Sequence, residues 1–186
     1  MIDENAYGLW LSYYDIENDE YALEREAFVE RLSEFSSLLR DCVRSFPLGT
    51  DLHAVDLGHA VYVEMADGSE EEDPIVWLKM TRARMTGRNF QTAAILTYGG
   101  RWTDEEDGIV ELDPFDKGGL VRIGHASEPL RKALYADAAS RRDEELDGWG
   151  PGLYVDTEAV EAMGRALKNA PTPLNASGAT FYRLGK

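Results

Sequence analysis

The first third of the chain contains an apolar strand pattern followed by a long helical pattern. Residues 7–16 are rich in Leu, Trp and Tyr and alternate weakly, as in a buried strand, and the carboxylates of Asp15 and Glu17 stand at its end. Apolar residues then recur at spacings of three and four, which predicts one apolar stripe along a helix of roughly six turns. The stripe consists of Val29, Leu32, Phe35, Leu39, Cys42 and Phe46. Pro47 and Gly49 end the helix, because proline cannot continue it and glycine accepts a left-handed cap.

The middle of the chain predicts a hairpin, a second helix and an interior strand. Residues 52–56 and 60–65 read as two short strands whose connection is short enough for a hairpin. Residues 75–88 read as a helix, with Asp73 as its N-cap. Residues 90–98 contain an uncharged apolar run, as expected for a strand that is covered on both faces.

The remaining elements extend this order. Two helices and three strands are predicted, at 120–123 (strand), 128–142 (helix), 153–155 (strand), 158–168 (helix) and 179–184 (edge strand). The first part of the chain therefore has the order β-α-β-β-α-β, which is typical of an α+β, ferredoxin-like antiparallel sheet with helices on one face. A C-terminal α/β extension follows. Because no linker composition interrupts the chain, we expect residues 1–186 to form a single domain.

Composition narrows the function classes. A chain of 186 residues with 44% apolar residues can bury a full core. Its net charge is −16, with 35 acidic and 19 basic side chains, which argues against nucleic-acid binding. The same charge is compatible with a soluble surface, a basic partner or carboxylates around divalent cations. Cys42 is the only cysteine and no apolar run is long enough to span a membrane, so we expect a cytoplasmic protein.

Several short motifs, in this order, resemble the class III nucleotide (adenylate/guanylate) cyclase homology domain, in a degenerate form of the short, single-domain bacterial type. No single motif is specific, and the resemblance rests on the ordered set, which covers residues 7–165. The motifs are Tyr14-Asp15-Ile16, Leu57-Gly58-His59-Ala60-Val61, residues 94–100, residues 127–133 and Pro151-Gly152-Leu153-Tyr154-Val155-Asp156.

The resemblance implies a site in which two aspartates hold two magnesium ions that activate a ribose hydroxyl and clamp a triphosphate. Asp15 matches the first aspartate, whereas His59 stands at the position of the second. Imidazole is a poor ligand for Mg²⁺, which prefers hard oxygen ligands. Asp56 and Glu17 are the acids that could replace the missing carboxylate. An alternative for Asp15 is a helix cap, and an alternative for His59 is a hairpin tip that faces water.

The family also implies an asparagine and an arginine on the third helix. Arg131 and Lys132 are the cations nearest to the matched motif and are therefore the catalytic candidates, although no asparagine precedes them by one turn. The residues that would read a nucleotide base cannot be assigned.

Three functional hypotheses follow. The first is a cyclase-like domain without a complete two-metal site, which acts as a nucleotide-sensing, regulatory or protein-interaction module and forms a homodimer, as the family does. We lean towards this non-enzymatic reading, in which the ligand is a nucleoside triphosphate or a cyclic nucleotide. The second is an active nucleotide cyclase that uses Mg²⁺ or Mn²⁺ with Asp15 and either Asp56 or Glu17. The third is an acidic protein-binding module unrelated to cyclases, with a basic partner.

Overall fold

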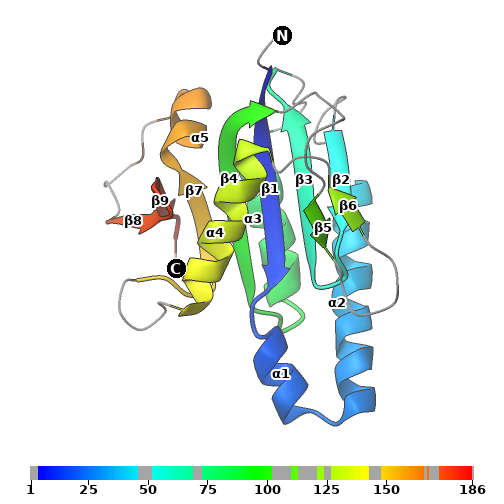
Figure 1. Ribbon diagram of the computed structural model, residues 1–186. Coiled ribbons are helices and arrows are strands. Elements are labelled where there is room, and N and C mark those ends of the chain that lie inside the picture. Colours follow the sequence, from blue (N-terminus) through cyan, green and yellow to red (C-terminus); the bar gives the residue numbers. More distant parts are fainter. Residues whose placement is uncertain are drawn as a thin grey trace.

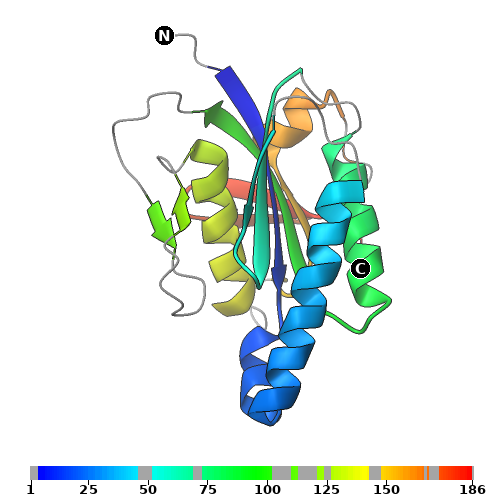
Figure 2. The same cartoon turned by 90° about the vertical axis from the view of Figure 1, so that its right-hand side faces the viewer.

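The computed structural model shows a mixed seven-stranded sheet with helices on both faces (Figures 1 and 2). It describes residues 4–45, 52–68, 73–101, 110–112, 121–123, 127–142, 148–165, 167 and 172–185. The strand order in the sheet is β2-β3-β1-β4-β7-β9-β8. These strands are β1 (Glu4–Tyr13), β2 (Leu52–Asp56), β3 (Ala60–Ala66), β4 (Thr92–Arg101), β7 (Gly152–Asp156), β8 (Pro173–Ala176) and β9 (Ala179–Arg183).

The other elements surround this sheet. A separate two-stranded sheet consists of β5 (Val110–Leu112) and β6 (Val121–Ile123). The helices are α1 (Ile16–Ala22), α2 (Arg25–Ser45), α3 (Pro74–Thr86), α4 (Glu128–Arg142) and α5 (Thr157–Ala162). The predicted α+β class, its βαββαβ order and the C-terminal extension are confirmed. The predicted helix end at residues 46–49 lies outside the described residues.

Strand β1 lies at the centre of the sheet, between β3 and β4, and pairs antiparallel with both. Side chains alternate between the faces of a strand, so β1 supplies two cores. Leu9 and Leu11 belong to the core beneath α2 and α3, whereas Trp10 belongs to the core beneath α4. This two-sided burial explains why the strand is apolar almost throughout.

One face of the sheet is covered by α2 and α3, in agreement with the sequence pattern. Phe35 and Leu39 of α2 are buried against it, as are Trp77 and Leu78 of α3. The side chain of Asp73 accepts a hydrogen bond from the backbone N–H of Ile75 (2.9 Å), which confirms the predicted cap of α3.

The opposite face is covered by α4, which corrects the expectation that all helices lie on one face. Leu130 and Ala133 pack there in the second core. Helix α4 precedes β7 in the chain, and β7 is parallel to β4, so the sheet is not wholly antiparallel. Gly8 permits close contact with α4, because a Cβ atom at this position would lie 2.7 Å from Cβ of Pro129.

Two further details differ from the sequence expectation. Strand β9 is not at an edge, because it pairs with β7 on one side and β8 on the other. Helix α1 forms a separate turn before α2 and is tied to it by an ion pair between Arg31 Nε and Asp19 Oδ2 (2.7 Å). The Arg31 guanidinium also lies 4.4 Å from the ring centroid of Phe90, and this cation–π contact ties α2 to the segment before β4.

Among the described helices, none combines the length and apolar character needed to cross a bilayer.

The packing of α2 predicts different effects for two truncations on the same helix. Leu39→Ala should lower the free energy of unfolding by about 2–5 kcal/mol, because it leaves a cavity under the sheet. Val29→Ala, at a side chain that is 55% exposed, should change it by less than about 0.5 kcal/mol. Urea denaturation followed by circular dichroism measures both. Equal effects would contradict the described orientation of α2.

Candidate functional site

The end of β1 lies beside the β2–β3 hairpin, where the resemblance places the two metal ligands. The backbone N–H of Tyr13 donates to the carbonyl of His59 (2.8 Å), which joins the two segments. Asp15 occupies the N-cap position of α1 but makes no side-chain capping hydrogen bond. Glu17 lies in the first turn of the same helix and is exposed. The structure thus brings the backbone around Asp15 and His59 to one end of the sheet.

Asp56 is engaged in the hairpin and in a contact with α2. Its Oδ1 accepts a hydrogen bond from the backbone N–H of Gly58 (2.8 Å), and its Oδ2 pairs with Arg40 of α2. Asp56 also stands opposite Val61, whose side chain belongs to the core beneath α2 and α3. The carboxylate of Asp56 therefore points towards the α2 face of the sheet.

His59 has a different environment, because its charged neighbours come from α4. Its Nδ1 lies 3.2 Å from the carbonyl of Leu57, and its side chain is half-buried. Burial lowers the pKa of His59; the Leu57 carbonyl and the charge of Asp137 oppose this shift, and the charge of Arg141 adds to it. The imidazole is therefore neutral at neutral pH, and Asp56 and His59 are directed to helices on opposite faces of the sheet.

The side chain of Arg141, on α4, lies against the end of β1. Its Nη1 donates to the carbonyl of Tyr14 (2.7 Å), and its Nη2 donates to the carbonyl of Tyr13 (3.3 Å) and to Oγ of Ser12 (2.9 Å). Its Nε forms an ion pair with Oδ2 of Asp137 (3.1 Å), and Ser12 Oγ donates to the other oxygen of this carboxylate (2.5 Å). The guanidinium thus satisfies the last carbonyls of β1 and is itself neutralised by Asp137.

Tyr14 completes this cluster. Its phenol oxygen donates to the carbonyl of Ser140 (2.8 Å), and its ring centroid lies 5.3 Å from the Arg141 guanidinium carbon. The side chain is buried. We call Ser12, Tyr14, Asp137, Ser140 and Arg141 the β1-end cluster.

Two of the acids near this end of the sheet are engaged with arginine side chains. Within the described parts of the chain, no group of three or more His, Cys, Asp or Glu side chains is placed to hold a metal ion. Asp137 is paired with Arg141, and Asp56 is paired with Arg40. Two-metal chemistry requires two neighbouring carboxylates that can share a divalent cation. The cation that the structure shows beside this end of the sheet is the guanidinium of Arg141.

Sequence reasoning missed Asp137 and Arg141. The signal was available, because an acid precedes a base by one turn near the end of the predicted helix 128–142. Arg131 and Lys132, the catalytic candidates, lie near the beginning of α4, and Arg131 is about 15 Å from Arg141 along the helix axis at 1.5 Å per residue. Only the tertiary structure shows that the last turn of α4 lies at the end of β1.

Lys132 joins α4 to the carboxyl ends of β4 and β7. Its Nζ donates to the carbonyl of Tyr98 (2.8 Å) and lies 3.3 Å from carboxylate oxygens of both Asp156 and Glu128. It also pairs with Glu158 of α5. Burial lowers the pKa of Lys132, but these carboxylates outweigh it, so the net shift is upward and the amine stays charged.

Asp156 is the most buried acid of this network, with 2% of its surface exposed. Its Oδ1 accepts the backbone N–H of Ala159 (2.7 Å), which caps α5, and its Oδ2 accepts the backbone N–H of Tyr98 (3.2 Å). Burial raises the pKa of Asp156 to about 6, although these hydrogen bonds and Lys132 lower it. Asp156 and Lys132 together hold α4, β4 and α5 in place, which accounts for both side chains structurally.

A cavity of about 540 Å³ lies beside this network. Arg131 and Tyr135 contribute to its wall from α4, and the turn at Ser177 and Gly178 contributes from the β8–β9 hairpin. Arg131 therefore lines a cavity that does not include the end of β1.

Comparison with solved structures identifies a similar fold. The chain matches a structure described as a bacterial light-regulated adenylyl cyclase, with a TM-score of 0.58 and 9% sequence identity. The match covers 96% of this chain and 51% of the other, so this chain spans about half the length of that protein. No protein-family model matches the sequence. No curated protein matches it either. The comparison therefore establishes a cyclase-like fold, and only the fold.

The raised pKa of Asp156 predicts a pH-dependent contribution to stability. Between about pH 4 and pH 6 the folded state holds this proton more tightly than the unfolded state, so stability falls as the pH rises through this range. Asp156→Asn removes the effect, and its stability relative to wild type should rise by up to about 3 kcal/mol from pH 4 to pH 7, for a pKa moved from 3.8 to about 6. Urea denaturation across this range measures it, with Asp41→Asn on α2 as the control for the loss of one carboxylate. A difference between Asp156→Asn and wild type that does not change with pH would contradict the assignment.

Proposed function

We propose that this chain is a nucleotide-cyclase-like domain that lacks a complete two-metal site and serves as a regulatory, protein-interaction module. The fold similarity to a bacterial adenylyl cyclase supports the first part of this proposal. The loss of catalysis is inferred from the residues of the site. A homodimer and a cytoplasmic location stay predictions from the resemblance and the composition.

The observation that carries the proposal is the guanidinium of Arg141 at the end of β1. A divalent cation beside Asp15 would find the nearby carboxylate of Asp137 already paired with Arg141. The same guanidinium takes the carbonyl of Tyr14, the residue next to Asp15. The cluster therefore favours a state in which the end of β1 is closed by the protein itself.

The position of the second carboxylate supports the same conclusion. His59 offers one imidazole in place of a hard anionic ligand, and burial favours its neutral form. A metal ion at Asp56 would compete with Arg40 and the Gly58 N–H for its carboxylate. These contacts favour a non-catalytic domain over one that needs Asp56 for turnover.

Two alternatives make different predictions. An active cyclase would use Asp15 with Asp56 or Glu17, and the accessible position of Glu17 in the first turn of α1 favours that pair over Asp56. An acidic binding module unrelated to cyclases shares the interaction role but predicts no effect of nucleotides on the protein. Nucleotide sensing without turnover is a third outcome, in which ATP or GTP would bind without reaction.

The direct test is a turnover assay. The purified chain, incubated with ATP or GTP and with Mg²⁺ or Mn²⁺, should form no cyclic nucleotide above the protein-free blank, as measured by mass spectrometry. Cyclic product that disappears in the Asp15→Ala variant would overturn the proposal and establish the active alternative. Equilibrium binding of the same nucleotides, measured by calorimetry, separates a sensor from a pure interaction module.

A second test concerns the structural role of Arg141. Arg141→Ala should lower the free energy of unfolding by about 2–3 kcal/mol, because it leaves the partly buried Asp137 carboxylate and the β1 carbonyls without their donor. Arg131→Ala, at an exposed side chain of the same helix, should cost less than about 0.5 kcal/mol. Thermal and urea denaturation check both variants. Unchanged stability of Arg141→Ala would contradict the structural role of this guanidinium.

A further inference from the structure

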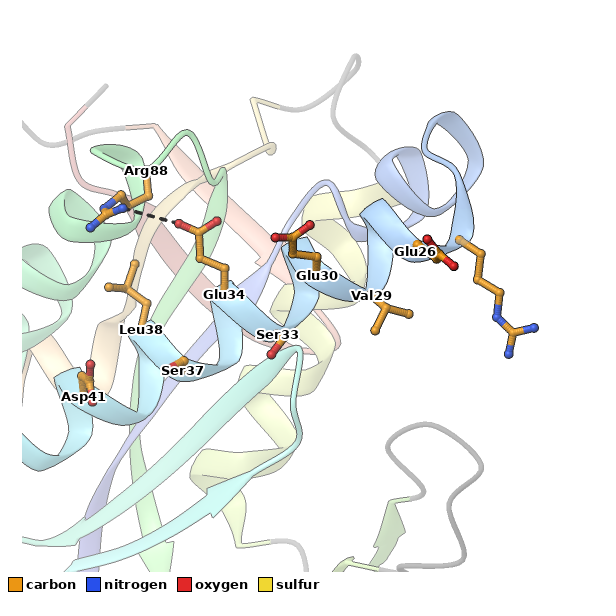
Figure 3. Close-up of a pocket in the computed structure, with 10 residues that line it drawn as sticks. Glu26, Val29, Glu30, Ser33, Glu34, Ser37, Leu38, Asp41 and Arg88 are labelled. Atoms are coloured by element: carbon orange, nitrogen blue, oxygen red, sulfur yellow. Dashed lines mark ion pairs between the residues drawn. The ribbon is translucent and has the colours of Figure 1, made fainter.

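The outer face of α2 carries a groove that neither the fold nor the β1-end cluster uses. Its volume is about 880 Å³, and nine of its ten lining residues belong to α2. The tenth is Arg88, which follows α3 and pairs with Glu34 (3.6 Å) at one wall (Figure 3). The groove thus lies on the side of the helix opposite to the buried Phe35 and Leu39.

The floor of the groove consists of one apolar and two small side chains. Val29 is 55% exposed there. Ser33 and Ser37 follow at one-turn spacing, and Figure 3 shows them on the same side of α2 as Val29. Carbon atoms contribute most of the exposed surface of the groove, although six of its lining residues are charged. Small side chains beside an apolar one leave room for a second helix to pack.

Acids outnumber bases by four to two among the charged residues that line the groove. Glu26 and Glu30 stand at one end and Asp41 at the other, and all three are exposed. The two bases are Arg25 and Arg88. At 1.5 Å per residue, the fifteen steps from Glu26 to Asp41 span about 22 Å, or about four helical turns. The net charge of −16 adds a long-range attraction for cations to this local pattern.

We propose that this groove docks a basic amphipathic helix of a partner protein. An apolar residue of the partner would lie over Val29 and the gap at Ser33 and Ser37, and its Lys or Arg side chains would pair with Glu26, Glu30 and Asp41. A second copy of this chain is a poor occupant through the same face, because the excess acids of the two grooves would repel. This inference deepens the proposed function and rests on it, since it names the surface and the partner chemistry of the interaction module.

The experiment uses a designed probe with the full-length chain. The probe is a peptide of about 16 residues, long enough for four turns, with Leu and Ala on one face and Lys and Arg on its flanks. Its affinity is measured by fluorescence anisotropy at physiological salt. Glu26→Gln/Glu30→Gln should weaken binding at least tenfold, about 1.4 kcal/mol or more, and Ser33→Trp should abolish it by filling the floor. A rise in salt should weaken it further.

Two controls separate specific docking from general attraction to an acidic protein. Glu158→Gln/Glu161→Gln removes the same charge on α5 and should change the affinity less than twofold. A scrambled peptide of the same composition, which has no apolar face, should bind at least tenfold more weakly. Absence of binding, equal weakening by the two double variants, or equal affinity of the scrambled peptide would overturn the proposal.

The outcome is independent of the turnover assay. Peptide binding together with cyclic nucleotide formation would reject the non-catalytic function and keep the groove. No turnover together with no peptide binding would reject the groove alone.

Discussion

The structure depends on the burial of β1 on both faces of the sheet. This strand pairs with β3 and β4 along almost its full length, and its alternate side chains supply the cores beneath α2 and α3 and beneath α4. A strand buried in this way cannot satisfy its terminal carbonyls with water, so they require donors from the protein. The chemistry at the end of β1 is therefore a consequence of how deeply the strand lies.

Arg141 meets this requirement with one side chain. Its planar guanidinium has five donors, which suits a site with two backbone carbonyls, a hydroxyl and a carboxylate around it. Asp137 balances the charge, so the cluster is both hydrogen-bonded and electrically compensated. The end of β1 is thereby joined to the last turn of α4 by a structural contact. The imidazole of His59 nearby is neutral, so it adds no charge to this compensated cluster.

Buried and exposed acidic side chains have different roles in this chain. Asp156 and Asp137 are buried or partly buried and are each matched to a cation, so they contribute to the arrangement of helices on the sheet. Glu26, Glu30 and Asp41 are exposed beside an apolar groove, where no packing within the described fold requires them. Burial therefore separates the acids that stabilise the domain from those that are available to a partner. Net charge alone does not make this distinction.

The sequence by itself determined the element types and most of their bounds, because apolar spacing and capping residues are local. Asp73 and Pro74 mark the start of α3, and the helix at 128–142 is found where the pattern places it. The apolar stripe of α2 is buried at Phe35, Leu39 and Cys42, whereas Val29, expected on the same stripe, is exposed. Tertiary structure alone decided which face of the sheet α4 covers, since an amphipathic stripe specifies burial but not the partner. It also decided that Arg141, rather than Arg131 or Lys132, reaches the end of β1, because the last turn of α4 lies there and its first turn lies beside Gly8, β4 and α5. The contacts of Arg141 with β1 join residues about 130 positions apart, and no local pattern of spacing or charge encodes them.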